Sequence, residues 1–231
     1  MIICLFYIIK IIDIQSDGVA GSYDDDGHVT RTYTVAGIRG EIYDRNGKLL
    51  VGNATHYDLI FEYGSMPDRR AEVNAALLEC LEALAVTGNA DKRVKGYFPL
   101  VRTDAGYEFS QALSDSESNE AYYYSRFLSK NPKIGADASA EQVVEYICDK
   151  YSLAERFYSQ SAIYELMRIY YDMERINFGY YQAYTLAEGF ETTVPEEMAL
   201  ISYVSEHRTE GATLIRSSER VYYYEGYAEH I

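Results

Sequence analysis

The chain has 231 residues, of which 48% are hydrophobic and 25% charged, so it can bury a substantial core. Its formal net charge of −15 argues against binding to DNA, RNA or an anionic membrane surface, because such binding rests largely on Lys and Arg. The three cysteines, Cys4, Cys80 and Cys148, form no C-x-x-C pair and give no sign of a disulfide-dependent fold.

The first 30 residues divide into an apolar stretch and a polar one. Residues 1–15 are apolar but are interrupted by Lys10 and Asp13, and they are fewer than the roughly 20 apolar residues of a membrane-spanning helix. An amphipathic or buried first helix is one interpretation of them. Residues 16–30 hold several glycines and an acidic run without hydrophobic periodicity, which predicts a flexible linker.

The segment 39–51 has the pattern of a β-hairpin. Ile42 and Leu49 to Val51 supply strand residues, and Asn46-Gly47 supplies a turn in which positive φ is cheap. Aromatic and β-branched side chains predict another strand over residues 56–63. A helix is then expected from Met66-Pro67-Asp68 to Gly88-Asn89, because apolar residues repeat there at helical spacing.

The rest of the chain alternates between short strands and helices. Residues 114–120 predict a polar loop, and the aromatic residues between 122 and 128 predict either core or a partner surface, with core favoured. Helices are expected after the capping box Ser139 to Gln142, over 161–176, and from a second capping box at Thr193 to Glu196. Strands are expected at 96–101, 107–109, 178–190, 213–216 and 220–224. This order favours a mixed α+β fold.

The hairpin also carries a family resemblance. The signature R-G-x-I-x-D-R-N-G-x-x-L-A-x-N opens the extracytoplasmic part of class B penicillin-binding proteins. The segment resembles this signature at Arg39, Gly40, Asp44, Arg45, Asn46, Gly47 and Asn53.

A second resemblance lies at the far end of the chain. The helix that starts at Pro195 leads to Gly211-Ala212-Thr213-Leu214, to Arg220 and Tyr222, and to the ending Tyr227 to Ile231. This run is similar to the family's Gly-Val-x-Ile strand, Arg-x-Tyr-Pro and A-A-H-I-L-G. Tyr223 and Glu229 depart from the pattern, since the family often has Pro and Ala or Ser there.

The resemblance implies a domain organisation. In the family, the region between the two signatures is a non-catalytic dimerisation or pedestal domain, which here would cover residues 31–231. Its ends would form a stalk (31–64 and 205–231), and its middle would form a head (about 65–204) that resembles the elongation- or sporulation-type branch. Residues 1–15 would then be the outer end of a truncated membrane anchor, with the domain on the extracytoplasmic side of the cell membrane.

The resemblance also implies partners and a process. The process is peptidoglycan synthesis, in which the pedestal positions a C-terminal D,D-transpeptidase. The partners would be that absent domain, a membrane glycosyltransferase and rod-shape scaffold proteins, with a homodimer as a further option. A free-standing extracytoplasmic binding module is the alternative function.

Reaction chemistry is missing from the sequence itself. The family's transpeptidase uses a serine with a lysine three residues later, together with S-x-N and K-T-G. Neither S-x-x-K nor K-T-G occurs, and the S-x-N match at Ser129-Lys130-Asn131 is near the level of chance and is interpreted as a loop. We therefore predict no catalytic residues, no metal site and no cofactor.

Other candidate residues receive structural interpretations. The four histidines are scattered without metal-ligand spacing. Glu196 and Glu197 fall in a first helical turn, where carboxylates favour the helix dipole, and an acid/base pair of a hydrolase is the weaker alternative. Arg39, Asp44, Arg45 and Arg220 either hold the stalk strands together through Arg–carboxylate contacts, which is favoured, or form a charged surface toward a partner.

Overall fold

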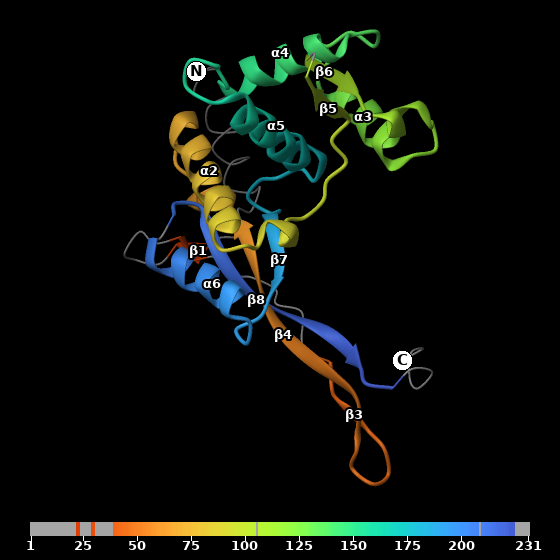
Figure 1. Cartoon of the computed structure of the whole chain (residues 1–231), viewed down its shortest axis with the longest axis vertical. Coiled ribbons are helices and arrows are strands. Elements are labelled where there is room, and N and C mark those ends of the chain that lie inside the picture. Colours follow the sequence, from red (N-terminus) through yellow and green to blue (C-terminus); the bar gives the residue numbers. More distant parts are fainter. Residues whose placement is uncertain (1–21, 24–28, 31–38, 105, 208, 225–231) are drawn as a thin grey trace, which may run out of the picture. The chain divides into compact units, whose positions relative to one another are not determined.

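The computed structural model describes residues 22–23, 29–30, 39–104, 106–207 and 209–224 (Figure 1). The chain divides into two compact units, Met1–Gly40 and Glu41–Ile231. The described part of the first unit is an antiparallel pair of strands, β1 (Ser22–Tyr23) and β2 (Val29–Thr30). This pair lies inside the predicted linker, which therefore contains some regular structure. The predicted anchor at residues 1–15 lies outside the described residues.

The second unit mixes helices with small antiparallel sheets, which confirms the predicted α+β class. Its helices are α2 (Arg70–Val86), α3 (Asn119–Lys130), α4 (Ala140–Tyr151), α5 (Gln160–Arg175) and α6 (Pro195–His207). Its strands are β3 (Ile42–Tyr43), β4 (Leu49–Phe61), β5 (Leu100–Thr103), β6 (Gly106–Phe109), β7 (Tyr184–Phe190) and β8 (Ala212–Tyr222). Short 3₁₀ turns at Tyr63–Ser65, Ala90–Lys92 and Gln111–Ser114 connect them.

Strand β4 is the centre of the main sheet. On one side it pairs with β8 along eleven residues, from Val51 opposite Tyr222 to Phe61 opposite Ala212, without a register shift. On the other side it pairs with β3 near its start and with β7 near its end. Figure 1 shows β4 and β8 side by side along this ladder. The two ends of the second unit's sequence are therefore joined directly by backbone pairing.

Five predicted strands differ from the observed ones. The strands expected at 213–216 and 220–224 form the single strand β8, because pairing with β4 continues through the polar Ser217 and Ser218. The hairpin strand and the strand expected at 56–63 are likewise one strand, β4. The strand expected at 178–190 begins only at Tyr184, because Gly179 and Gln182 bond to each other in a turn.

Helix α3 is not among the predicted elements. It begins at Asn119, inside the polar loop expected over residues 114–120, and the Ser118 hydroxyl accepts from the Ala121 N–H at its start. Phe127 is buried on its inner face, whereas Tyr122 is 54% exposed, so the aromatic segment is divided between core and surface. The capping box of Ser139 and Gln142 at the start of α4 is confirmed by both of its hydrogen bonds.

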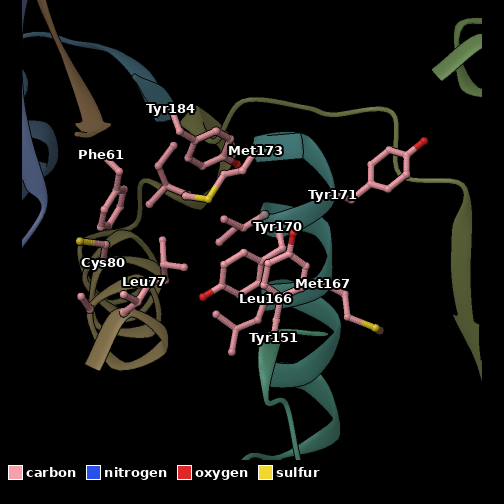
Figure 2. Packing of buried hydrophobic residues seen from close by; sticks show 14 of the residues in the cluster. Phe61, Leu77, Cys80, Tyr151, Leu166, Met167, Tyr170, Tyr171, Met173 and Tyr184 are labelled. Carbon is pink, nitrogen blue, oxygen red and sulfur yellow. The ribbon is translucent and has the colours of Figure 1, made fainter. Parts of the chain in front are cut away.

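The core lies where α5 packs against α2, α3 and α4, with β4 and β7 contributing side chains from the sheet (Figure 2). Phe61 and Leu77 are fully buried on the side of β4 and α2, and each such side chain contributes about 1.5–3 kcal/mol of hydrophobic stabilisation. On the other side, the rings of Tyr151 and Tyr170 stack with centroids 3.9 Å apart. Tyrosine therefore fills much of the space that aliphatic residues would otherwise occupy.

Candidate functional site

The turn of the β3–β4 hairpin accounts for several residues of the first signature. Gly47 has φ +81° and its N–H donates to the Asp44 carbonyl at 3.0 Å. The Asp44 carboxylate accepts from the backbone N–H groups of Asn46 at 2.7 Å and Lys48 at 2.9 Å. These bonds, that of Lys48 foremost, lower the pKa of Asp44. The turn is where the sequence predicts it, but among Asn46 and Gly47 only the glycine adopts positive φ.

The signature residues at the two ends of the sequence meet in the β4–β8 ladder. Asn53 lies opposite Arg220, and Val51 lies opposite Tyr222. The expected proximity of the hairpin to the segment around Arg220 is thus confirmed within one sheet. Tyr222 is 38% exposed.

Gly211 directly precedes the other end of the ladder, where Ala212 pairs with Phe61. It has φ +84°, and a Cβ at this position would lie 2.9 Å from Cγ of Met66. Its carbonyl accepts from the Glu62 N–H at 2.9 Å. Gly211 therefore meets both a conformational and a steric requirement, as expected for a glycine in a signature.

The Arg–carboxylate contacts expected for Arg39, Asp44, Arg45 and Arg220 remain a prediction. The Asp44 carboxylate accepts hydrogen bonds from backbone N–H groups of its own turn. On β8, the guanidinium of Arg216 donates to the Thr55 hydroxyl at 3.3 Å. Arg39, Gly40 and Arg45 are exposed.

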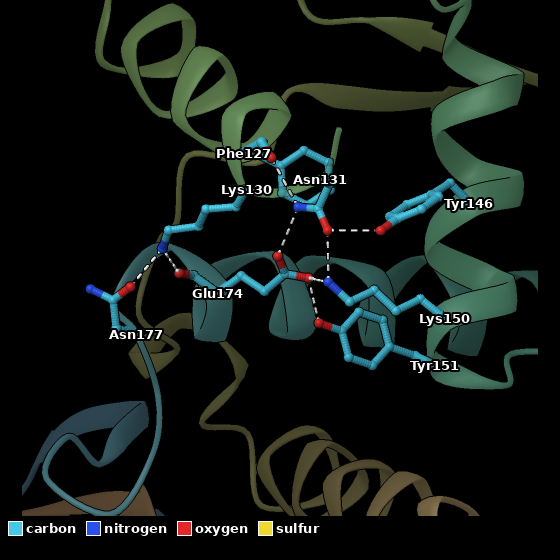
Figure 3. A network of polar contacts seen from close by, with 8 residues as sticks. All are labelled: Phe127, Lys130, Asn131, Tyr146, Lys150, Tyr151, Glu174 and Asn177. Atoms are coloured by element: carbon cyan, nitrogen blue, oxygen red, sulfur yellow. Dashed lines mark hydrogen bonds and ion pairs between the residues drawn. The ribbon is translucent and has the colours of Figure 1, made fainter. Parts of the chain in front are cut away.

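A partly buried polar network joins α3, α4 and α5 (Figure 3). The Glu174 carboxylate accepts from Lys150 Nζ at 2.7 Å, from Asn131 at 3.0 Å and from the Tyr151 hydroxyl. The Asn131 amide oxygen also accepts from Tyr146 at 2.9 Å and from Lys150 at 2.8 Å. Burial alone would raise the pKa of Glu174, but the bonds from Asn131, Lys150 and Tyr151 outweigh it and the pKa lies below its ordinary value.

Sequence reasoning missed this network. The pattern S-x-N was interpreted as a loop, whereas Asn131 is 3% exposed and caps the C-terminus of α3. Pro132 directly after it was a usable signal, because proline often follows the end of a helix. Nothing in the local sequence places Glu174 beside Lys150, since their helices meet only in the folded chain.

A cleft of about 570 Å³ lies next to this network. It opens between the segment that leads into α2 and the end of α5 with its following turn, and Arg70 and Lys130 contribute cations to its lining. The Arg70 guanidinium lies 5.3 Å from the ring centroids of both Tyr151 and Tyr170. Lys130 Nζ donates to the Glu174 carbonyl at 2.8 Å and to Asn177 Oδ1 at 2.6 Å.

The other candidate residues take structural roles. Glu197 is 7% exposed, forms an ion pair with Lys92 at 3.0 Å and accepts from the Glu191 N–H at 2.5 Å. The Glu196 carbonyl accepts from the Asn89 amide at 2.9 Å. In the described part of the chain, no three His, Cys, Asp or Glu side chains converge as metal ligands. None of the described helices combines the length and the apolar character needed to cross a bilayer.

Comparison with known families shows to which protein family this chain belongs. The family model of the penicillin-binding protein dimerisation domain matches residues 34–231. The chain belongs to this family. The match runs from just before the hairpin to the last residue, so both signatures of the dimerisation domain fall inside it. No curated protein matches the chain.

Solved structures of penicillin-binding protein 2B from Streptococcus pneumoniae are similar to the dimerisation domain. For the protein of strain 5204 the identity is 18% and the TM-score 0.36, over 83% of this chain and 27% of that one. For the protein of strain R6 the identity is 17% and the TM-score 0.38, over 81% and 25%. The chain thus spans about a quarter of the length of these solved chains.

Proposed function

We propose that this dimerisation domain is the non-catalytic N-terminal part of a class B penicillin-binding protein, and that it positions a D,D-transpeptidase domain in peptidoglycan synthesis. The family match over residues 34–231 is the observation that carries the proposal. The absence of S-x-x-K and K-T-G from the sequence supports a scaffold role for this stretch.

The β4–β8 ladder supports the positioning role. Because Asn53 pairs with Arg220, the strand that enters the head and the strand that leaves it are held in one register. A domain attached after β8 would therefore be linked to the start of β4 through a paired sheet rather than through a free linker. The parent protein would be anchored in the cell membrane with this domain on the extracytoplasmic side. Its contacts would include a membrane glycosyltransferase, rod-shape scaffold proteins or a second copy.

The test is labelling with fluorescent penicillin. We expect the 231-residue chain to remain unlabelled and the product of the complete gene to be acylated at a serine within S-x-x-K, because the penicillin-reactive site belongs to the transpeptidase. Acylation of the 231-residue chain would contradict the proposal. A gene that ends at Ile231 in an intact genome would instead favour the free-standing binding module.

A further inference from the structure

The cleft beside the polar network holds two cations whose described contacts are not carboxylates. Among the described residues, neither Arg70 nor Lys130 takes part in an ion pair with Asp or Glu. Arg70 lies over tyrosine rings, and Lys130 donates to a carbonyl and an amide oxygen. Both side chains thus keep a positive charge in the cleft.

The acidic residues of the cleft offset this charge only in part. Glu174 is already neutralised by Lys150, whose Nζ lies 2.7 Å from its carboxylate. Asp68 is exposed at the start of the α2 segment. The cleft is lined by two cations and by two carboxylates, Asp68 and Glu174, and because Lys150 already pairs with Glu174, one positive charge is left over. This charge favours a ligand that carries a carboxylate.

Part of the remaining lining is apolar and adaptable, although Val73 and Met173 expose only 5% of their surface. Met66, Val73 and Met173 contribute aliphatic and thioether surface, and methionine adjusts to differently shaped side chains. Tyr63 and Tyr180, which also line the cleft, are 46% and 70% exposed. Exposed aromatic rings beside an apolar hollow are typical of binding surfaces rather than of ordinary monomer surface.

We infer that this cleft binds an extended peptide segment of a partner protein in which a carboxylate side chain stands next to an apolar one. The apolar side chain would occupy the hollow beside Met66, and the carboxylate would be attracted by both Arg70 and Lys130. A neutral glycan is less suited, because it has no carboxylate to meet the cations of the cleft. The inference rests on the proposed function, since it gives the scaffold's protein contacts a surface and a partner chemistry.

The test selects random dodecapeptides displayed on phage against the full chain. Enriched peptides are synthesised with a fluorescein label, and their binding is measured by fluorescence anisotropy. We expect Asp or Glu beside Leu, Ile, Phe or Met. Binding should weaken about tenfold or more in Arg70→Glu and in Lys130→Gln, because each change removes a charge contact.

Two matched controls separate the cleft from general charge effects. Arg69→Glu reverses the charge of the residue next to Arg70, and Lys133→Gln removes a positive charge close in sequence to Lys130. Neither Arg69 nor Lys133 lines the cleft. Both variants should therefore bind the peptides within about twofold of the original chain. Circular dichroism confirms that each variant is folded.

Four results would overturn the inference: no enriched peptide, enriched peptides without acidic residues, equal binding by Arg70→Glu, or displacement of the peptide by soluble peptidoglycan glycan chains. The last would make the cleft a glycan site. Fluorescent penicillin labelling does not involve the cleft, so failure here leaves the proposed scaffold function standing and the two failures can be told apart.

Discussion

At the scale of single residues, Gly96 is a position where a close approach between backbone and side chain limits which residue the fold accepts. Gly96 lies against the buried carboxylate of Asp172, which is held by Arg175 Nε at 2.8 Å. A Cβ at Gly96 would overlap with that carboxylate. We predict that Gly96→Ala lowers the free energy of unfolding by about 3 kcal/mol, because the carboxylate must move away from its arginine.

Urea unfolding measures this loss, and Gly135→Ala is the matched control. A Cβ added at Gly135 would meet no heavy atom within 4 Å, and the residue has no positive φ, so its change should be neutral or slightly stabilising. An equal loss in both variants would contradict the steric account of Gly96.

Glu174 predicts a specific dependence of stability on pH. Its pKa is lower in the folded chain than its ordinary value, so the ionised carboxylate stabilises the fold above the pKa of an unfolded glutamate. This stabilisation is lost as the pH falls through the folded pKa. We predict that Glu174→Gln costs about 1–3 kcal/mol at pH 7 and much less near pH 3.

The measurement is urea unfolding of both chains at several pH values between 7 and 3. Glu145→Gln, an exposed position in the middle of α4, is the control and should show little loss at any pH. A loss in Glu174→Gln that stays constant down to pH 3 would show that the carboxylate charge does not hold the network together.

At the scale of elements, β8 has one paired edge and one edge without a strand partner among the described residues. In an antiparallel ladder, every second residue of a strand bonds to the partner strand through its backbone. The bonds from Glu62 N to Gly211 O and from Tyr223 N to Leu50 O show that on β8 these are the odd-numbered residues. Ser217, opposite His56, therefore directs its N–H toward β4, and the N–H of Ser218 points to the other edge.

We predict that Ser217→Pro destabilises the domain by about 3 kcal/mol or more, because proline removes a ladder hydrogen bond. Ser218→Pro should cost much less, since the N–H it removes does not bond to β4. Thermal unfolding of the two variants measures the difference. Equal losses would contradict the assignment that the N–H of Ser217 bonds to β4 while that of Ser218 points away from it.

Helices and strands could be predicted where the residues that determine them lie close together in the sequence. Helices α4 and α5 and the hairpin turn follow from caps, apolar spacing and a glycine, all within a few residues. The continuity of β8 through Ser217 and Ser218 comes from its partner strand, so in the sequence alone the polar pair resembles a break. Helix α3 was missed because its many tyrosines mask the helical pattern.

Some residues of the candidate sites could be selected from the sequence, and others became visible only in the folded chain. Gly47 could be selected from the sequence because positive φ in a tight turn leaves few alternatives to glycine, whereas Gly211 was selected through the family resemblance and its positive φ became visible only in the structure. Asn131, Arg70 and Glu174 could not, because their partners lie on other helices and are brought together only by packing. Signature residues thus mark local backbone requirements, whereas the cleft is a property of tertiary structure.

At the scale of the whole molecule, the account rests on the β4–β8 ladder, which joins sequence positions more than 150 residues apart, such as Thr55 and Ser218. This pair is of the type without mutual backbone bonds, in which Cα atoms lie about 4.5 Å apart, a separation that a disulfide spans. The register can therefore be tested by cross-linking.

The most direct measurement is disulfide formation in Thr55→Cys/Ser218→Cys, identified by mass spectrometry of the linked peptides. The account predicts near-complete cross-linking under mild oxidation. It predicts almost none in Thr55→Cys/Tyr222→Cys, where the second cysteine lies about 13 Å further along the strand. Absence of the first cross-link, or equal formation of both, would contradict the ladder and with it the pedestal.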